Sequence, residues 1–450
     1  MSEESFLKPQ KKIPGIPAIR ISQVSELLRD ITQNLKTVFS NRNIVAISAT
    51  NMLYTIFNGF WELWWSLYLV EVLGVSATIV GLLATVQNTS RILFQLPGGM
   101  LADRIGRKKV IVYGTALRVI APIFLYFADS WVWVAPGMII NAVASIYMPA
   151  FNALIAESLP EDSRGAGFGA YRFMTGIPSI FMPVVSGYWL DVMGLERGVK
   201  LGLLMFIGAA SIAVTVRQIF LSETLENPQD EKHGEGEGEG MIDTFKRQPP
   251  TVWAMLAILV ISGFAMRMTW AFLSLYATNV VGLSTTQYGA LQSIAMFISV
   301  PLYLVSGLIS DKMSRKNLIL LARGLGPFDS LSLLLFDSYP KLMVAYGVIG
   351  VAQGIGGGRL RTGGFMGGPA WNSLLTDLVP AKDRGKVMGL MGTVSGLVAF
   401  PGSIIGGLIY DRSPDLLLLS GSLLEALSIP IIILFLKDPK QGKRAKPQPR

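Results

Sequence analysis

Long runs of apolar residues, separated by short polar breaks, fill the chain from residue 44 onward. Most runs are long enough for a helix of about 20 residues, the length that crosses a lipid bilayer. The first six runs lie near 44–70, 78–102, 109–128, 131–156, 168–190 and 199–221. Six more lie near 251–280, 286–309, 317–337, 341–376, 387–410 and 414–436. The pattern predicts an all-α integral membrane protein with twelve transmembrane helices.

Three polar segments lie outside these runs and divide the chain into domains. Residues 1–43 are basic and lack the apolar core and cleavage site of a signal peptide, so we expect them in the cytoplasm. Residues 222–250 contain a run of alternating Gly and Glu and are expected to form a flexible cytoplasmic linker. Residues 437–450 form a basic cytoplasmic tail. The predicted domains are an amino-terminal six-helix bundle, 44–221, and a carboxy-terminal one, 251–436.

Composition supports the membrane interpretation. Hydrophobic side chains make up 51% of the 450 residues and charged side chains 15%, whereas soluble domains carry about 25% charge. The chain has no cysteine and one histidine, which excludes disulfides, thiolate metal sites and histidine clusters. We therefore expect no cofactor and no metal.

The placement of basic residues predicts the orientation in the membrane. A net charge of +9 would suggest nucleic-acid binding in a soluble protein, but most of the 39 Lys and Arg residues fall in the tails, the linker and the loops on the same side. The opposite face carries Arg197, Lys200, Lys341 and Arg412. Cytoplasmic loops carry the excess of basic residues. We therefore expect a multi-pass protein of the cell membrane with both termini cytoplasmic and no nucleic-acid partner.

The two halves of the chain resemble each other. LYLVEVLGVS at 67–76 matches LYATNVVGLS at 275–284, and PAFNALIAESLPEDSRG at 149–165 matches PAWNSLLTDLVPAKDRG at 369–385. Both matches keep the chain direction, which indicates a parallel repeat with a substrate site near the midplane between the halves. The spacing grows from 208 to 220 residues, and we place the insertion in the glycine-rich stretch at 354–368, which contains Arg359 and Arg361. Whether that stretch lies at membrane depth stays open.

The loop between the second and third predicted spans carries a family resemblance. PGGMLADRIGRKK at 97–109 resembles the loop signature of the major facilitator superfamily, roughly GxLxDRxGRK. GLISDKMSRK at 307–316 is a weaker copy, with Ser314 in place of the glycine. The resemblance implies the fold of that superfamily, two six-helix bundles related by a parallel pseudo-repeat. It also implies that this loop locks the halves together on the cytoplasmic side in one conformation and releases them in the other.

The resemblance implies particular contacts for the residues of this loop. Asp103 would meet the start of the eleventh span, and Arg107 would pair with Glu157 at the end of the fourth. Gly99 would allow close helix approach, and Gly106 would permit a tight turn. The predicted gating residues are Gly99, Asp103, Arg104, Gly106, Arg107, Glu157, Gly307, Asp311 and Arg315. For Lys108, Lys109, Arg315 and Lys316, the alternative is that they only anchor the loops on the cytoplasmic side through their positive charge.

The fifth span contains GIPSIFMPVVSG at 176–187. It is similar to the glycine and proline pattern of drug-proton antiporters in the same superfamily, but Met182 and Ser186 stand where glycines are expected. A position near that branch is one expectation. The alternative is that the remaining glycines and prolines only bend or pack the helix.

Polar residues inside spans are candidates for the transport pathway, because they are costly in lipid and usually face a cavity or the bundle interior. Along the first span, a polar face is predicted by the helical spacing of Asn51, Thr55, Asn58, Glu62 and Ser66. We expect Glu62 to be a proton-binding carboxylate or a substrate counter-ion. Hydrogen bonding to neighbouring helices is the alternative for the smaller polar residues.

Arg267, in the seventh span, lies one helical turn from the position that matches Glu62 in the repeat. The two side chains are predicted to face each other, either as a pair that breaks on protonation or substrate binding, or as a permanent structural pair. Arg91 and Arg118 either line the same cavity or bridge helices. The predicted pathway residues are Asn51, Asn58, Glu62, Arg91, Arg118 and Arg267. Arginines outnumber carboxylates among them, which favours an anionic substrate.

These features predict a secondary active transporter of a small organic solute that works by alternating access. A proton is the expected coupling ion because Glu62 is available. An uncoupled facilitator of the same fold is the first alternative, and a membrane receptor or sensor on a transporter scaffold is the second. The sequence contains no GxxxxGKS or GxxxxGKT phosphate loop and no linked set of nucleophile, base and orienting group, so we expect no enzyme. We expect a monomer.

Overall fold

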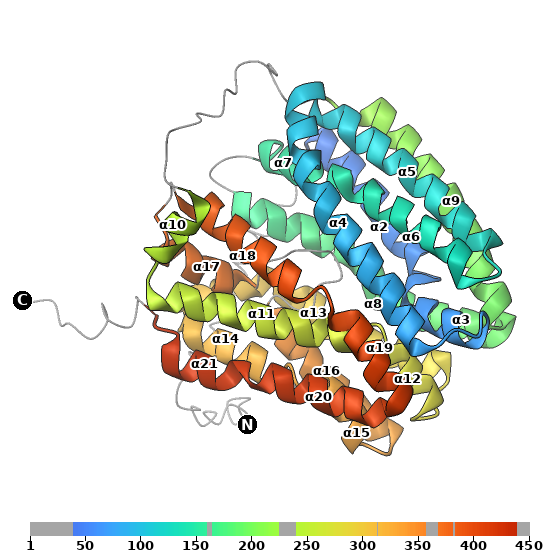
Figure 1. The fold of residues 1–450 in the computed structure, drawn as a ribbon. Helices are drawn as coiled ribbons and strands as arrows, with labels where there is room; N and C mark the ends of the chain where they lie inside the picture. Colours follow the sequence, from blue (N-terminus) through green and yellow to red (C-terminus); the bar gives the residue numbers. More distant parts are fainter. Residues whose placement is uncertain are drawn as a thin grey trace, which may run out of the picture.

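The computed structural model describes residues 39–159, 164–224, 240–312, 314–356, 368–380 and 383–438. Within these ranges the regular structure is helical, with no strand. The helices form two bundles, one from each half of the chain, that lie side by side (Figure 1). The predictions for Arg359 and Arg361, for most of the basic tails and for the middle of the linker fall outside the described residues.

The amino-terminal half begins with a broken helix and continues with longer ones. Its elements are α2 (Arg42–Gly59), η1 (Glu62–Trp64), α3 (Trp65–Glu71), α4 (Ala77–Ile105), α5 (Arg107–Phe127), α6 (Trp131–Ala144), η2 (Ser145–Tyr147), α7 (Met148–Glu157), α8 (Arg164–Met193) and α9 (Leu195–Phe220).

The carboxy-terminal half repeats this order after a short helix in the linker. Its elements are α10 (Met241–Lys246), α11 (Pro250–Trp270), α12 (Leu273–Asn279), α13 (Thr285–Lys312), α14 (Arg315–Gly324), α15 (Phe328–Leu335), α16 (Tyr339–Gly356), α17 (Pro369–Leu378), α18 (Arg384–Val398), α19 (Gly402–Arg412), α20 (Pro414–Ala426) and α21 (Ser428–Phe435).

Eight helical segments among the described residues are long and apolar enough to cross a membrane. They correspond to the third to seventh, ninth, eleventh and twelfth predicted spans. The described parts of the first, second, eighth and tenth predicted spans are helical too. The first is interrupted after Gly59, and residues 357–367 of the tenth lie outside the description. The fold is therefore that of a helical membrane protein.

The internal repeat is visible in the backbone. Gly74 and Gly282 follow α3 and α12, and both take positive φ angles, +65° and +77°. A glycine in this left-handed region ends a helix at little cost because it has no Cβ. Each is followed by the next long helix of its half, α4 or α13. The matched sequences LYLVEVLGVS and LYATNVVGLS therefore form the same helix end.

The first predicted span is not one continuous helix, which corrects the predicted polar face. α2 ends at Gly59, and Glu62 lies in the 3-10 turn η1. The break occurs where two neighbouring helices pack closely: a Cβ at Gly59 would lie 3.0 Å from Cβ of Met182, and a Cβ at Gly202 would lie 3.0 Å from Cβ of Phe60. Glu62 and Ser66 consequently lie beyond the end of this helix, although Glu62 still accepts a hydrogen bond from Asn58.

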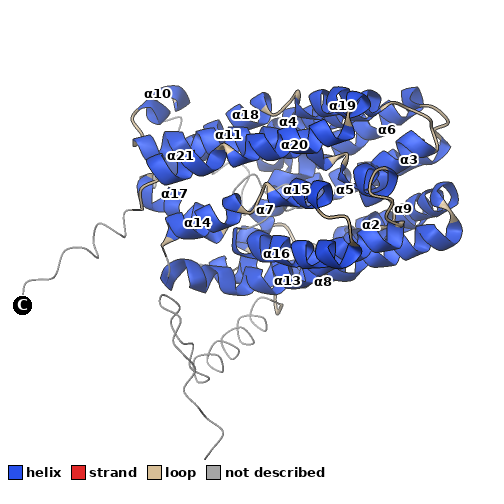
Figure 2. Ribbon diagram, turned by 90° about the horizontal axis from the view of Figure 1, so that it is seen from below, coloured by secondary structure: helices blue, strands red, loops and turns tan. Residues whose placement is uncertain are grey.

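The ends of the bundles define two sides of the molecule. We call the end that holds the start of α2, the end of α21 and helix α10 the linker side, and the other end the opposite side. Two antiparallel pairs join the halves: α4 packs along α19, and α8 packs along α13 (Figures 1 and 2). At the opposite side, the end of α19 lies beside the start of α4, and the end of α8 lies beside the start of α13.

The predicted linker is packed at both of its ends rather than free throughout. Asn43 donates a hydrogen bond to the carbonyl oxygen of Ser222 (3.2 Å). At the other end, α10 packs against α18, and the ring of Phe245, 1% exposed, lies edge-on to Trp253. The buried ring of Phe245 therefore helps to dock the last part of the linker on the second bundle.

Candidate functional site

Two carboxylates hold the halves together at the opposite side by capping helix N-termini across the interface. Asp191, near the end of α8, accepts a hydrogen bond from the backbone amide of Thr286 in the first turn of α13 (3.0 Å). Asp411, near the end of α19, accepts from the amides of Ala77 and Thr78 at the start of α4, both at 2.9 Å. A carboxylate is favoured there because free amides and the helix dipole point at it.

The two caps are related by the internal repeat. The donors Thr78 and Thr286 are 208 residues apart, and the acceptors Asp191 and Asp411 are 220 residues apart. These are the same spacings that relate the matched sequences. A third contact joins Asn279 to Glu71, whose carboxylate accepts its hydrogen bond at 2.6 Å. Glu71 and Asn279 occupy matching positions in the repeat, so this contact joins equivalent surfaces of the two halves.

Glycines allow the backbones to meet at the capped ends. A Cβ at Gly187 would lie 2.2 Å from the carbonyl oxygen of Thr285. A Cβ at Gly407 would lie 2.3 Å from that of Ala77. The two further approaches are Gly81 to Ser403 O (2.2 Å) and Gly289 to Pro183 O (2.1 Å). Any side chain at these positions would push the halves apart, so the opposite side is closed by direct backbone contact.

On the linker side, each half carries its own ion pair at the start of its third helix. Arg107, 6% exposed, pairs with Glu157 at the end of α7, which is the contact that the family resemblance implies. Arg315, at the matching position, pairs with Asp377 near the end of α17. Both pairs lie within one half, so they brace the loop rather than join the halves.

Two acids that the sequence analysis missed complete these loops. Glu223 accepts hydrogen bonds from the backbone amides of Arg107 (3.0 Å) and Lys108 (3.1 Å), and so caps α5. Asp438 accepts from the amide of Arg315 (2.9 Å), and so caps α14. In each half, a leucine follows the last helix, and the acid comes two residues after that leucine. This shared position is the sequence signal that could have revealed the two acids.

The same caps explain why a glycine stands in one loop and a serine in the other. Gly106 has φ +97°, and a Cβ there would lie 2.5 Å from Oε2 of Glu223. Ser314, at the matching position, has φ −64°, which any residue adopts. Its hydroxyl donates to Asp438 (3.2 Å). Only the first loop therefore requires glycine.

The remaining gating residues are less engaged in this conformation. Asp103 makes no hydrogen bond or ion pair with any described residue, those of the eleventh span included, and Arg104 is exposed. The close helix approach expected at Gly99 belongs to Gly98, whose Cβ would lie 2.1 Å from the carbonyl oxygen of Ile146, whereas one at Gly99 would reach no atom closer than 3.8 Å. Gly307 and Asp311 lie on α13, and their surroundings fall outside the description.

A fully buried arginine organises the linker-side part of the first bundle. Arg217, in α9, is 0% exposed, and its three guanidinium nitrogens donate to Thr50 (3.1 Å), Thr115 (2.7 Å) and Asn51 (3.0 Å). Asn51 also donates to the hydroxyl of Tyr171. Asn51 is thus a ligand of a buried cation. Sequence reasoning missed Arg217, although an arginine inside the apolar run 199–221 was the available signal.

Aromatic rings link this arginine to Arg118. The guanidinium carbons of Arg118 and Arg217 each lie 5.2 Å from the ring centroid of Tyr54. Arg118 also donates to the hydroxyl of Tyr147 (3.2 Å). Contacts of this kind stabilise a buried cation without neutralising it. The two arginines therefore share one tyrosine ring in the interior of the first bundle.

Glu62 lies near two of the predicted arginines. It accepts a hydrogen bond from Asn58 and lies within electrostatic range of both Arg91 and Arg118. Its side chain is exposed within the protein structure. Asn58, Glu62, Arg91 and Arg118 are therefore brought into one region of the first bundle.

Arg267 has other partners than the predicted one. Its guanidinium donates to the carbonyl oxygen of Gly396 in α18 (3.0 Å) and lies within electrostatic range of Arg91. An ion pair with Glu62 is not among the contacts of the described residues. In this conformation the guanidinium of Arg267 is held by a backbone carbonyl oxygen of α18 rather than by a carboxylate of the described residues.

The two departures from the antiporter pattern in the fifth span have structural reasons. Met182 packs against Gly59 at the end of α2. The hydroxyl of Ser186, fully buried, accepts a hydrogen bond from the indole of Trp64 (2.9 Å). Both residues therefore fix the broken first span against α8.

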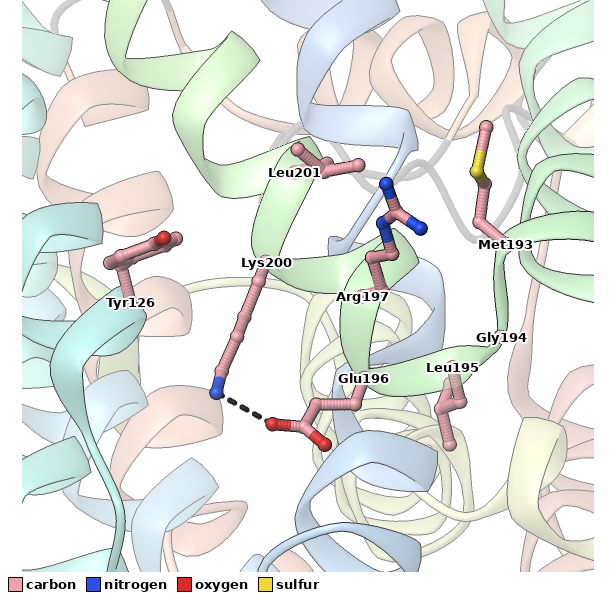
Figure 3. Close-up of a pocket in the computed structure, with 8 residues that line it drawn as sticks. All are labelled: Tyr126, Met193, Gly194, Leu195, Glu196, Arg197, Lys200 and Leu201. Carbon is pink, nitrogen blue, oxygen red and sulfur yellow. Dashed lines mark hydrogen bonds and ion pairs between the residues drawn. The ribbon is translucent and has the colours of Figure 1, made fainter.

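A hollow of about 480 Å³ opens on the opposite side of the first bundle, where α8 turns into α9 (Figure 3). Glu196 and Lys200 pair across its rim at 2.7 Å, and Arg197 and Tyr126 line it (Figure 3). These residues are separate from those that flank the interface between the halves. The hollow is a surface feature and not the predicted pathway.

The chain matches the family model of the Major Facilitator Superfamily over residues 44–362. It is 21% identical to an uncharacterized MFS-type transporter of Methanocaldococcus jannaschii over 82% of this chain and 88% of the relative. It is 23% identical to the multi-drug resistance efflux pump PmrA of Streptococcus pneumoniae over 75% and 83%. The crystal structure of the nucleoside transporter NupG has a similar fold, with a TM-score of 0.64, 13% identity and coverage of 87% and 98%.

The family match spans well over half of the chain, and the fold agrees with it: two helical bundles of repeated sequence, joined by antiparallel helix pairs. The loop resemblance at 97–109 is confirmed at the level of the family. Both findings point to a transporter rather than an enzyme. The chain belongs to the major facilitator superfamily.

Proposed function

We propose that this protein is a secondary active transporter, which carries a small organic solute across the cell membrane by alternating access with a proton as coupling ion. The proposal rests on one observation: the halves are tied by repeat-related carboxylate caps at the opposite side, while charged residues of both halves lie near the middle of their interface. A solute site between two halves that close at alternate ends is the arrangement of this class of transporter.

The proposed orientation puts the linker side in the cytoplasm. The basic residues of the loops and tails support it, because cytoplasmic loops carry the excess of Lys and Arg. With this orientation, the structure corresponds to a state whose outer side is closed. We propose that the protein works as a monomer, because both halves of the interface come from one chain.

The proposed substrate is a small organic molecule with negative charge. The relative PmrA is named as a multi-drug efflux pump and the structural neighbour NupG as a nucleoside transporter, and both names refer to small organic solutes. The negative charge is argued from Arg91, Arg118 and Arg267, which outnumber the one carboxylate, Glu62, in electrostatic range of the first two. Arginine is well suited to bind carboxylate and phosphate groups.

Glu62 is the proposed proton carrier. Its carboxylate is held by Asn58 and lies near two arginines, so protonation would change the charge of the site. A carboxylate whose charge controls neighbouring cations is a means of coupling proton movement to solute binding.

The test is transport by purified protein in proteoliposomes, with a pH gradient imposed across the membrane. We expect the gradient to drive solute accumulation by the wild type, and Glu62→Gln to abolish this accumulation while exchange of solute without a gradient persists. Glu196→Gln removes an exposed carboxylate of the opposite side and serves as the control, with wild-type accumulation. Equal accumulation by Glu62→Gln would contradict the proposed proton role. Downhill flux without any response to the gradient would favour an uncoupled facilitator.

A further inference from the structure

Two arginines from different halves flank the same glycine near the middle of the interface. Gly396, in α18, accepts a hydrogen bond from Nη1 of Arg267 at 3.0 Å. A Cβ on Gly396 would lie 3.0 Å from Cδ1 of Ile92 in α4, and Arg91 directly precedes Ile92. The two arginines therefore approach the same glycine of α18 from different halves, and their charges lie within electrostatic range of each other.

Both arginines have donors to spare. A guanidinium group carries five N–H donors. Among the described residues, Arg267 uses one nitrogen on Gly396, and the side chain of Arg91 makes no hydrogen bond. Both side chains are half-buried, where like charges repel more strongly than in water. An anion bound between them would accept hydrogen bonds from these donors. Each arginine would then be attracted to the anion instead of only being repelled by the other arginine.

We propose that the acidic group of the transported solute, a carboxylate or a phosphate, binds between Arg91 and Arg267 and thereby pulls the two halves together. The inference rests on the proposed transport function and assigns its substrate class and its trigger. Without the solute, the two arginines repel each other and resist closure of the linker side. With the solute, each half is attracted to the same negative charge. The empty protein is thereby prevented from closing without cargo.

The test exchanges the signs of the two charges and measures the distance between the halves. The chain contains no cysteine, so Ile219→Cys and Phe435→Cys place spin labels at exposed positions near the linker-side ends of α9 and α21, one in each half. Arg91→Glu or Arg267→Glu alone creates an attractive pair, and we expect the distance distribution to shift to shorter values. The double reversal restores two like charges and is expected to return the distribution to that of the wild type.

Arg197→Glu is the matched control, because it makes the same change of net charge at an exposed position away from the interface. We expect it to leave the distribution unchanged. Arg91→Gln and Arg267→Gln remove one charge without reversing it and guard against misfolding of the stronger variants; each is expected to give a smaller shift in the same direction. Unchanged distances in the single reversals, or a double reversal as short as the singles, would overturn the proposal whether or not a ligand is known.

The substrate class is tested with paired probes on the full-length protein. Adenosine monophosphate is compared with adenosine, and D-glucarate with glucitol, by their effect on the thermal unfolding temperature, since a ligand that binds the folded state raises it. Any stabilisation by an acid is expected to exceed that by its neutral partner and to vanish in Arg91→Gln and Arg267→Gln. Equal stabilisation by a neutral partner that persists in both variants would overturn the assigned class. Failure of all solute flux with an intact charge cycle would instead refute the transport function.

Discussion

At the scale of single residues, Gly106 combines a backbone requirement with a packing requirement. Its φ of +97° strains any side chain, and a Cβ there would also displace the carboxylate of Glu223. Ser314 meets neither requirement, although it occupies the matching position. The glycine of the first loop is therefore a local structural need and not a property of the repeat.

We expect Gly106→Ala to destabilise the protein. A side chain in the left-handed region costs roughly 1–2 kcal/mol, and the crowded Glu223 carboxylate adds to that cost. The free energy of unfolding and the Tm of the purified protein are expected to fall. Gly208→Ala is the control, because a Cβ there meets nothing within 4 Å, and its Tm is expected to stay or rise. A Tm for Gly106→Ala equal to that of the wild type would contradict this account.

Prediction of single residues from the sequence succeeded where a motif supplied both partners. The pair of Arg107 with Glu157 is present as the family resemblance implies. Arg217 and Glu223 were missed, because their partners are hydroxyls, an amide side chain and backbone amides, which no spacing rule connects to a distant arginine or acid. The pair of Glu62 with Arg267 depended on helix register, which the break after Gly59 changes.

At the scale of helices, the contacts between α8 and α13 and between α4 and α19 hold the opposite side closed. Two features act together there: glycines that permit backbone contact, and carboxylates that cap the partner helix. Replacing an aspartate by asparagine weakens a cap without changing the shape of the side chain. The contribution of the caps to closure of the opposite side can therefore be measured directly.

Asp191→Asn combined with Asp411→Asn is expected to loosen the opposite side. An amide loses the charge and one acceptor oxygen, and a charged helix cap contributes on the order of 1 kcal/mol. Two such losses change the ratio of open to closed molecules by roughly 30-fold, since 1.4 kcal/mol is tenfold. Spin labels at Phe127→Cys and Leu335→Cys, exposed at the opposite-side ends of α5 and α15, are expected to move apart.

The control for this pair is Asp337→Asn. Asp337 lies on the same side, but it pairs with Lys341 of its own half at 2.7 Å. Its replacement is expected to leave the label distance unchanged. If the double cap variant also leaves the distance unchanged, the glycine contacts alone hold the halves, and the caps have no part in closure.

The helices themselves were largely predictable, because apolar runs of membrane-spanning length are a strong signal. The breaks inside these helices could not be predicted from the sequence. The turn between α2 and η1 forms where Gly59 and Phe60 meet Met182 and Gly202, and contacts between distant segments leave no periodic trace in the sequence. The docking of α10 through Phe245 was hidden for the same reason, since one aromatic residue does not alter the composition of the linker.

At the scale of the whole molecule, the structure presents one of the two states that alternating access requires. The opposite side is capped, and Asp103 on the linker side has no partner among the described residues. We propose that the contact that the resemblance implies between Asp103 and the eleventh span forms in the other state. The sequence predicts such a contact but not the conformation in which it forms.

Asp103→Asn is expected to reduce the rate of transport far more than the affinity for the solute. The solute meets this state before Asp103 forms its contact, so binding is preserved, whereas the change of state is impeded. Flux in proteoliposomes and equilibrium binding to the purified protein separate the two effects. Asp243→Asn, an exposed acid of α10, is the control and should change neither. Full flux from Asp103→Asn would count against a gating role.

The paired caps have a consequence for the origin of the chain. Asp191 of one half holds the start of α13 in the other, and Asp411 returns the same contact to α4. An interface in which each partner offers the other the same patch is isologous, the form found in twofold homodimers. A half-length ancestor with one such aspartate and one such helix start already had what it needed to pair with a copy of itself. Gene fusion would then have joined two subunits that were complementary before they were covalently linked.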